Sequence, residues 1–201
     1  VEALIAQGAG IGDLRAFIAT SFSGLFTPES ADSFTLSSMG AIGALRSMTK
    51  AGKLSVIPCH VGQIGPMIEA GIIGCDVAFV QVSPADDDGN HSFGLTHDHV
   101  QAMVAKARVV IAEVNDSVPY TFGEAMLPAS KIDCAVHVSR IPSQVMPTTA
   151  SETDEAIAKI IANYVEDGSV LQVGVGAIPD AVMRLSRDRK DLGVHSGMIG
   201  D

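Results

Sequence analysis

Hydrophobic positions along this chain recur with the spacing of helices in some stretches and with the spacing of strands in others. The opening shows a helical pattern, in which Leu4 and Ile5 are followed by apolar residues up to Ile18 across the glycine-broken "GAGIGD". A second helical stretch is expected around "TLSSMGAIGALRSMTKAGK", ended by Gly52, and a strand in "LSVIPCHV". The first quarter of the chain therefore predicts two helical stretches and then a strand.

The middle of the chain continues with the order helix, strand, helix, strand. "IGPMIEAG" predicts a short helix with Gly71 past its end, and "CDVAFVQVS" predicts a continuous, buried strand. A polar turn, "PADDDGNHSFG", leads into the predicted helix "THDHVQAMVAKA" and the predicted strand "RVVIAEVN". Because such alternation implies right-handed βαβ units, we predict an α/β protein with a mainly parallel sheet flanked by helices.

Residues 139–152, "SRIPSQVMPTTASE", are rich in proline and small polar residues and predict a linker. They divide an N-terminal domain at 1–138 from a second domain at 153–201. In the second, "TDEAIAKIIANYVEDG" predicts a helix capped by Thr153 and ended by Gly168. A strand in "SVLQVGVG", a helix in "PDAVMRLSRDR" and a strand in "LGVHS" follow, so we expect the beginning of a similar α/β domain that stops early.

Composition narrows the class of protein and its partners. With 47% hydrophobic residues in 201, the chain can bury a sizeable core, and with only 4% aromatic residues that core must be aliphatic. The net charge of −10, without a cluster of Lys or Arg, disfavours nucleic acid and anionic lipid. No membrane span or signal peptide is visible in the sequence. Three widely spaced cysteines, Cys59, Cys75 and Cys134, indicate buried reduced thiols and a cytoplasmic protein.

The segment "LQVGVGAIPDAV" is the first candidate site. A strand runs into a glycine loop, and Pro179 is expected at the first helical position, followed by Asp180. Backbone N–H groups would then face an anionic group or a developing oxyanion at a helix N-terminus, with glycines allowing close approach. A dinucleotide fingerprint would need a small residue where Pro179 stands. A tight turn without a ligand is the alternative interpretation.

The second candidate is "VSPADDDGNHSFGLTHDH", which gathers three aspartates and three histidines. The acids are consecutive, so they do not match a calcium loop, and His97 and His99 are two residues apart, which separates them on a helix. We expect no metal and interpret the segment as a solvated strand-end turn at the carboxyl edge of the sheet. His60 and Gln63 follow another strand and could line the same crevice. No nucleophile elbow or phosphate-binding loop occurs.

Three segments together resemble the acetyl-CoA hydrolase/transferase family, especially its branch similar to 4-hydroxybutyrate CoA-transferase. They are "DVAFVQVSPADDDGNHSFG", "ARVVIAEVNDSVPYTFGE" and "DGSVLQVGVGAIPDAVMRLSRDRKDLGVHSGMIGD", in this order. The resemblance implies two similar α/β domains of the NagB/RpiA/CoA-transferase type with the active site in the cleft between them. It also implies that the first domain lacks its opening strand here. Coenzyme A, as acyl-CoA, and small carboxylates would be the ligands, without a metal, and the protein would be a homo-oligomer.

In this family a glutamate attacks the acyl-CoA thioester, and an acyl-glutamyl anhydride and a glutamyl-CoA thioester follow. The resemblance places the glutamate, from a His-Thr-Glu-Met motif, where this chain has Gly197. The expected nucleophile is therefore absent. The residues that the resemblance places beside CoA are Gly174, Val175, Gly176, Ala177 and Ile178, and those that it places beside the substrate are Pro179, His195, Ser196 and Met198.

Three functions remain open at this point. The first is a CoA-transferase or acyl-CoA hydrolase homologue with an altered mechanism, and the second is a non-catalytic CoA-binding or assembly subunit of the same fold. A sugar-phosphate isomerase of the same fold group is the third, and it would need a catalytic acid and lysine near the strand ends. Asp180 and Lys190 support it poorly, because the helix between them keeps them apart.

Overall fold

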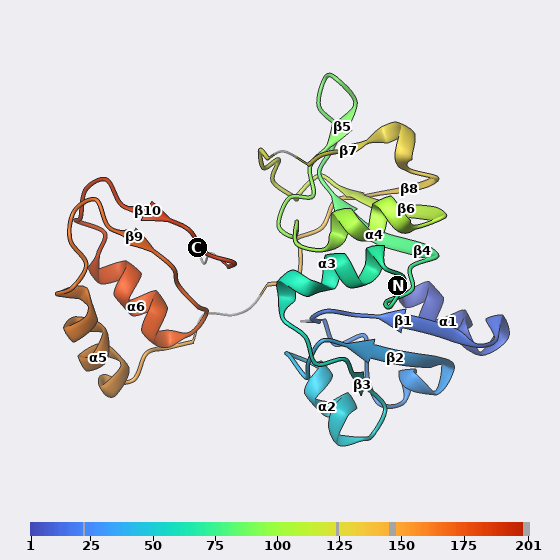
Figure 1. The fold of residues 1–201 in the computed structure, drawn as a ribbon, viewed down its shortest axis with the longest axis horizontal. Coiled ribbons are helices and arrows are strands. Elements are labelled where there is room, and N and C mark those ends of the chain that lie inside the picture. The colour runs from blue at the N-terminus through green and yellow to red at the C-terminus, as the bar shows by residue number, and fades with distance from the viewer. Residues whose placement is uncertain (22, 124, 145–147, 199–201) are drawn as a thin grey trace. The chain divides into compact units, whose positions relative to one another are not determined.

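A computed structural model describes residues 1–201 except 22, 124, 145–147 and 199–201. The chain forms two compact units, Val1–Gln144 and Val145–Asp201, which are described here one at a time (Figure 1). The division between them lies inside the predicted linker 139–152. The domain boundaries 1–138 and 153–201 stay predictions.

The first unit begins with a three-stranded parallel sheet in the order β1-β2-β3. Its strands are β1 (Leu14–Phe17), β2 (Phe34–Ser38) and β3 (Ser55–Val56), and its helices are α1 (Glu2–Ile11), the short 3-10 helix η1 (Ser30–Ser33) and α2 (Leu45–Lys50). Leu36 of β2 packs with Leu45 and Met48 of α2 in a small buried cluster. In this sheet Leu14 lies opposite Phe34, and Ser37 lies opposite Ser55.

Two of the predicted helical stretches are partly wrong in this region. The first ends before Gly12, whose φ of 99° lies in the left-handed region that favours glycine, and the chain continues as β1. The stretch expected to be helical from residue 35 starts as β2, and only Leu45–Lys50 is helix. Pairing between β1 and β2 explains both differences, because their partners lie about twenty residues away in sequence and leave no local signal.

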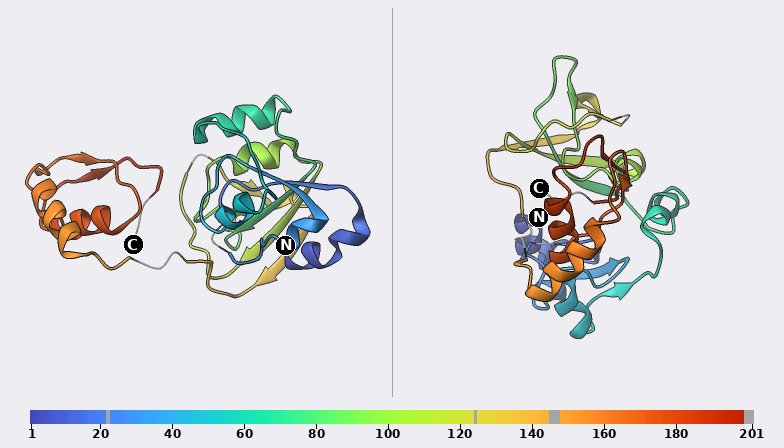
Figure 2. Two further views of the ribbon diagram at one scale, coloured as in Figure 1. Left: turned by 90° about the horizontal axis from the view of Figure 1, so that it is seen from below. Right: turned by 90° about the vertical axis from the view of Figure 1, so that its left-hand side faces the viewer.

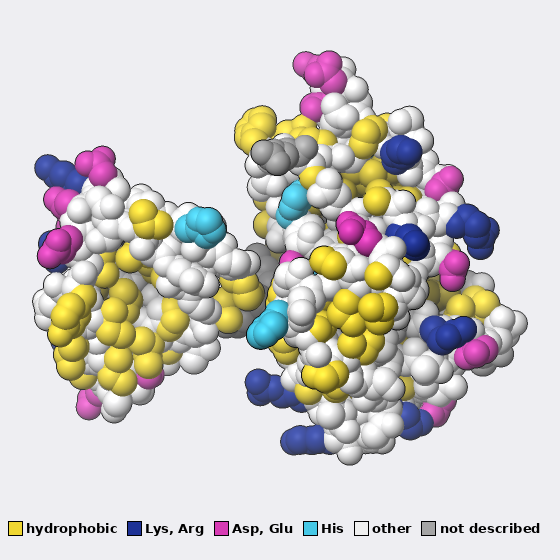
Figure 3. Space-filling model, in the orientation of Figure 1, with side chains coloured by type: hydrophobic (Ala, Val, Ile, Leu, Met, Phe, Trp, Pro, Cys, Tyr) yellow, Lys and Arg dark blue, Asp and Glu magenta, His cyan; other side chains and the backbone are white. Residues whose placement is uncertain are grey.

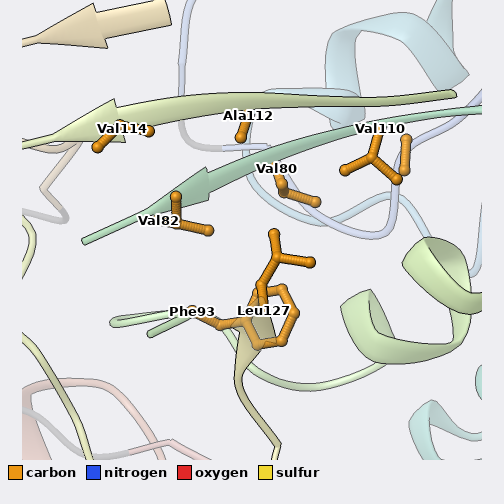
Figure 4. Packing of buried hydrophobic residues seen from close by; sticks show 8 residues of the cluster. Val80, Val82, Phe93, Val110, Ala112, Val114 and Leu127 are labelled. Carbon is orange, nitrogen blue, oxygen red and sulfur yellow. The ribbon is translucent and has the colours of Figure 1, made fainter. Parts of the chain in front are cut away.

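A second three-stranded parallel sheet, in the order β4-β6-β8, carries the largest core of the first unit. Its strands are β4 (Val77–Val82), β6 (Val109–Asn115) and β8 (Cys134–Val138), and the accompanying helices are α3 (Val61–Glu69) and α4 (Val100–Lys106). The parallel α/β class predicted from the sequence is confirmed. Figure 4 shows Val80 and Val82 of β4 pointing toward Phe93 and Leu127, with β6 alongside.

Strand β4 is not continuously buried as its sequence predicted. Burial alternates along it: Ala78, Val80 and Val82 are buried, whereas Val77 is 41% and Phe79 45% exposed. The helix-facing side of the sheet is therefore the core side. Apolar sequence alone cannot separate the two faces of such a strand.

A small antiparallel pair rises beyond the second sheet. It is formed by β5 (Asn90–His91) and β7 (Leu127–Pro128), with His91 opposite Leu127, and the short 3-10 helix η2 (Ala129–Lys131) follows. The loop before β5 projects from the unit, as the right-hand view of Figure 2 shows in green. This pair places the loops that follow β4 and β6 side by side.

The second unit packs two helices on one side of a two-stranded parallel sheet (Figures 1 and 2). Its elements are α5 (Glu152–Ala162), β9 (Val170–Leu171), α6 (Ala177–Leu185) and β10 (Gly193–Val194). Ala158, Val165, Ala181 and Val182 form its buried cluster. An ion pair between Arg184 and Glu155 links α6 to α5.

The helix boundaries of the second unit differ from the predicted ones. Ser151, not Thr153, caps α5, because its hydroxyl accepts from the Asp154 N–H at 3.2 Å while the Asp154 carboxylate accepts from the Ser151 N–H at 2.8 Å. Helix α6 begins at Ala177, so Pro179 is its third residue and not its first.

Hydrophobic side chains remain exposed on the second unit. Figure 3 shows them gathered over its helical part. Those in and after α5 are Ile157, Ile160, Ile161 and Tyr164, the last with 81% exposure. This face contributes nothing to the buried cluster of the unit.

The thiols also differ from the prediction. Cys59 and Cys75 are half-buried, and Cys134 is exposed, with no disulfide among these three. Burial raises the pKa of the Cys75 thiol, which keeps it in its neutral form.

In the part of the chain that the structure describes, no helix is long and apolar enough to cross a membrane.

Candidate functional site

The strand pair of the second unit positions its candidate loops. Strands β9 and β10 are parallel, with Val170 opposite Gly193 and Leu171 opposite Val194. Because parallel strands end at the same edge, the glycine loop after β9 and the segment after β10 leave the sheet together. The backbone N–H of His195 continues the ladder by donating to the Leu171 carbonyl at 2.9 Å.

Ser196 holds the two loops against each other. Its hydroxyl donates to the Val173 carbonyl at 2.7 Å and accepts from the Val173 N–H at 3.3 Å. A longer bond, 3.4 Å, runs from the Met198 N–H to the same hydroxyl. The predicted substrate residue Ser196 is thus a structural link, and it brings 195–198 against the start of the glycine loop.

The glycine loop ends at the N-terminus of α6. Gly176 caps the helix with a φ of 137°, which side chains rarely adopt, and its carbonyl accepts from the Asp180 N–H at 3.1 Å. Ala177 and Ile178 are the first helical residues, so their N–H groups have no intrahelical partner. Such N–H groups favour an anion or an oxyanion. The Asp180 carboxylate in the same first helical turn is negatively charged and therefore disfavours a bound anion.

The remaining predicted residues leave open space at this edge. No heavy atom lies within 4 Å of where a side chain would begin at Gly174 or at Gly197. His195 is exposed, and Val175 and Met198 are 60% and 50% exposed. The edge therefore has exposed backbone and one imidazole, and it has room for an added side chain at residue 197.

In the first unit, the acidic turn that the sequence singled out is an internally bonded structure. The Asp86 carboxylate accepts from the Asp88 N–H at 3.0 Å, from the Asn90 N–H at 2.8 Å and from the Tyr120 hydroxyl at 2.6 Å. The Tyr120 bond is the main cause that lowers the pKa of Asp86, and the same bond raises the pKa of Tyr120 to about 12. The Asp86 carboxylate therefore stabilises the conformation of the turn through these hydrogen bonds.

The histidines of this turn are separated from one another. His91 is buried, with Nδ1 2.8 Å from the Ser83 carbonyl oxygen, and His97 packs edge-on against Phe93. His99 lies edge-on to Phe17, and burial lowers the pKa of its imidazole. Over the described ranges, no three side chains of His, Cys, Asp or Glu form a group that could hold a metal ion.

The other predicted strand-end pair, His60 and Gln63, forms a helix cap. The His60 N–H donates to the Gln63 side-chain oxygen at 3.0 Å at the start of α3. This contact explains Gln63 without a ligand. Among the described residues, no side-chain hydrogen bond joins His60 or Gln63 to the acidic turn, so a crevice shared by these segments stays a prediction.

One feature of the first unit was not predicted from the sequence: the Ser92 hydroxyl forms hydrogen bonds to two loops, one through Gly94 and one through Thr121. This hydroxyl donates to the Thr121 carbonyl at 2.8 Å and accepts from the N–H groups of Gly94 at 3.0 Å and Thr121 at 3.1 Å. The Thr121 hydroxyl in turn donates to the Gly94 carbonyl at 3.0 Å. Beside these hydrogen bonds is an open pocket of about 140 Å³, lined by Ser92, His97, Thr121, Phe122, Gly123 and Ala125.

Several known proteins are similar to this chain. A curated 4-hydroxybutyrate coenzyme A transferase of Clostridium kluyveri is 36% identical over 159 residues, which cover 79% of this chain and 37% of the relative. A butyryl-CoA:acetate CoA-transferase of Anaerostipes caccae is 36% identical over 177 residues, which cover 85% of this chain and 40% of the relative. The chain thus spans well under half the length of these relatives.

Solved structures agree with this relationship. RipA from Yersinia pestis matches with a TM-score of 0.87 and 28% identity over 97% of this chain and 48% of that protein. A 4-hydroxybutyrate CoA-transferase from Porphyromonas gingivalis matches with a TM-score of 0.73 and 28% identity over 100% of this chain and 54% of that protein. The family model of the acetyl-CoA hydrolase/transferase N-terminal domain matches residues 29–147. The chain therefore belongs to the acetyl-CoA hydrolase/transferase family.

Proposed function

We propose that this chain provides the CoA-binding loop of an acyl-CoA:carboxylate CoA-transferase or an acyl-CoA hydrolase. The observation that carries the proposal is the bond between the Ser196 hydroxyl and the Val173 carbonyl, 2.7 Å long. It brings together the two segments, 174–178 and 195–198, to which the family resemblance assigns CoA and the reacting group. Their position between two domains, as the resemblance implies, stays a prediction.

The geometry of the loop suits a thioester or a phosphate oxygen. The N–H groups of Ala177 and Ile178 stand at the start of α6, where the helix dipole favours negative charge. Gly174 and Gly176 leave the backbone open to a ligand, since no side chain covers it. His195 is exposed beside them and can donate a hydrogen bond from its ring.

Gly197 decides which chemistry this edge can perform. In the family chemistry a glutamate carboxylate attacks the thioester carbon, the C–S bond breaks, and CoA leaves as a thiolate. The thiolate then attacks the glutamyl carbonyl and releases the acyl group as a carboxylate. A glycine cannot take part in either step. Without that carboxylate, we expect hydrolysis by direct attack of water, or transfer through another group that replaces the glutamate. The second candidate is a non-catalytic CoA-binding subunit, which needs no nucleophile at residue 197.

Restoring the carboxylate tests the proposal. Gly197→Glu places the new side chain in open space, and Gly197→Gln is a control of the same size without a nucleophile. After incubation with acetyl-CoA, mass spectrometry is expected to find a covalent CoA adduct on the Glu variant and none on the Gln variant. Calorimetry of the unaltered chain is expected to show saturable CoA binding.

The outcomes separate the candidates. Hydrolysis of acetyl-CoA by the unaltered chain, without an adduct, supports direct attack by water. Saturable CoA binding without turnover supports the binding subunit. If neither CoA binding nor an adduct on the Glu variant is found, the proposal is wrong. A homo-oligomer and a cytoplasmic location, also expected from the sequence, stay predictions.

A further inference from the structure

The two sheets of the first unit are joined by apolar packing. Among the described residues they share no strand pair, since β1-β2-β3 and β4-β6-β8 are separate sheets. A buried cluster of Ile64 and Ile68 from α3 and Ile73 instead receives side chains from both parts. Phe17 of β1 packs against this cluster, and so does Met103 of α4, which also packs against the core of the second sheet. We call these five residues the apolar joint. A charge brought into it would cost free energy and loosen it.

His99 lies at the apolar joint. It directly precedes α4, and its carbonyl accepts from the Met103 N–H at 3.1 Å, so the two residues lie one helical turn apart on the same face. The imidazole lies edge-on to Phe17, with the ring centres 6.1 Å apart. Only 8% of the His99 side chain is exposed. The imidazole is therefore part of the contact between β1 and α4.

The His99 imidazole fits this place only in its neutral form. Its buried Nδ1 atom has no hydrogen-bond partner among the described residues. The Asp98 carboxylate is 3.7 Å from that atom, too far for a hydrogen bond, and its side chain is 49% exposed to solvent. Burial is the main cause that lowers the pKa of His99, and the Asp98 charge opposes it. A protonated imidazole carries an N–H on both ring nitrogens, so the Nδ1 N–H would be buried without an acceptor.

Other charged groups near the apolar joint do not compensate a charge on His99. The elements packed around it carry these titratable or charged side chains: Arg15 of β1, His60 and Glu69 of α3, Lys106 of α4, and the thiols Cys59 and Cys75. All except the thiols are exposed, and among the described residues none of them forms an ion pair with His99. The Lys106 ammonium donates to the Glu69 carbonyl at 3.3 Å. Asp98 is therefore the charged group that faces the imidazole.

We propose that His99 is an acid-sensitive switch whose protonation opens the apolar joint between β1 and α4. The inference is independent of the proposed function. Because the folded protein binds the His99 proton less tightly than the open form, in which histidine has its ordinary pKa of about 6.5, falling pH favours the open form. The joint is therefore fully stable above about pH 6.5 and loses stability as the pH falls toward the lower pKa of the folded form. Over that interval each pH unit raises the equilibrium constant for opening by up to about tenfold.

Thiol labelling of the whole 201-residue chain measures this opening. Cys59 and Cys75 are half-buried and pack against the joint, whereas Cys134 is exposed and serves as the internal reference. The chain is treated between about pH 8 and about pH 5, the range in which histidine titrates, with dithiodipyridine, which reacts with thiols in acid. Mass spectrometry follows each cysteine. The ratio of Cys75 to Cys134 labelling is expected to rise as the pH falls below about 6.5, by up to about tenfold for each pH unit. A ratio that does not rise over this range would overturn the inference.

Two variants and one direct titration make the test specific to His99. His99→Phe keeps a ring beside Phe17, and His99→Gln keeps a polar group of similar size, but neither can be protonated, so both should remove the rise in labelling. His137→Gln, which replaces an exposed histidine of β8, is the matched control and should keep the rise. A rise that persists in either His99 variant would refute the assignment. NMR titration of the His99 imidazole in the unaltered chain does not depend on how the variants fold: a midpoint below about 6.5 supports the inference, and a midpoint at or above that value overturns it.

Discussion

Gly94 is the position at which the loops of the first unit are most sensitive to an added methyl group. Its backbone φ is 62°, and a Cβ there would lie 2.2 Å from Val118 Cγ1 and 3.2 Å from the Pro119 carbonyl oxygen. Val118 is only 4% exposed, so it cannot move aside into solvent. Gly94→Ala is therefore expected to combine backbone strain with overpacking.

A second left-handed glycine provides the control. Gly89 has a φ of 78°, but no heavy atom lies within 4 Å of its Cβ position, so Gly89→Ala meets the strain alone. The left-handed conformation costs an alanine about 1 kcal/mol. Overpacking adds about 1–3 kcal/mol, so Gly94→Ala should lower the free energy of unfolding by about 2–4 kcal/mol.

Urea unfolding followed by tyrosine fluorescence measures this difference in one unit. The chain has two tyrosines and no tryptophan, so in a Tyr164→Phe background the signal comes from Tyr120 of the first unit. The unfolding midpoint of Gly94→Ala should fall clearly below that of Gly89→Ala. Equal decreases in the free energy of unfolding of the two variants would show that the Val118 side chain moves aside without an energetic penalty. That result would refute the close packing of the loop at Gly94 against the loop at Val118.

Two more predictions concern single hydroxyl groups. Ser196→Ala should lower the free energy of unfolding of the second unit by about 1–3 kcal/mol, because the Val173 N–H and carbonyl lose their partner. Ser196→Thr keeps the hydroxyl and should lose less, so equal losses in urea unfolding would contradict the assigned bonds. For Tyr120, the folded-state pKa of about 12 lies above the ordinary tyrosine pKa of about 10, so the stability from its bond to Asp86 is full below pH 10 and is lost as the pH rises through about 12. Phenolate absorbance in the Tyr164→Phe variant should show this late titration, and Asp86→Ala should shift it to lower pH; an unchanged titration in Asp86→Ala would refute the bond as its cause.

The pattern of the sequence determined the elements whose signals are local. Helices α3, α4, α5 and α6 were expected from the local sequence pattern, with Gly71 and Gly168 past the ends of α3 and α5, and β4 and β6 were expected from their β-branched runs. The family could also be inferred, because whole segments of the chain carry the resemblance and relatives at 36% identity share it. Boundaries were less certain: Ser151 caps α5 two residues before the predicted Thr153, since Asp154 completes its capping box.

Contacts between distant residues decided the rest. Strand β8 was not predicted, because its residues are exposed or half-buried and only pairing with β6 makes them a strand. Ser92 and Thr121 are 29 residues apart, and nothing local indicates that one serine hydroxyl joins two strand-end loops. The bonds of the Ser196 hydroxyl to the Val173 backbone also join residues 23 apart, and the contact of Ser196 with a substrate stays a prediction. The sequence by itself specifies local periodicity and chemistry, while side-chain partners follow from strand order and register, which exist only in the folded chain.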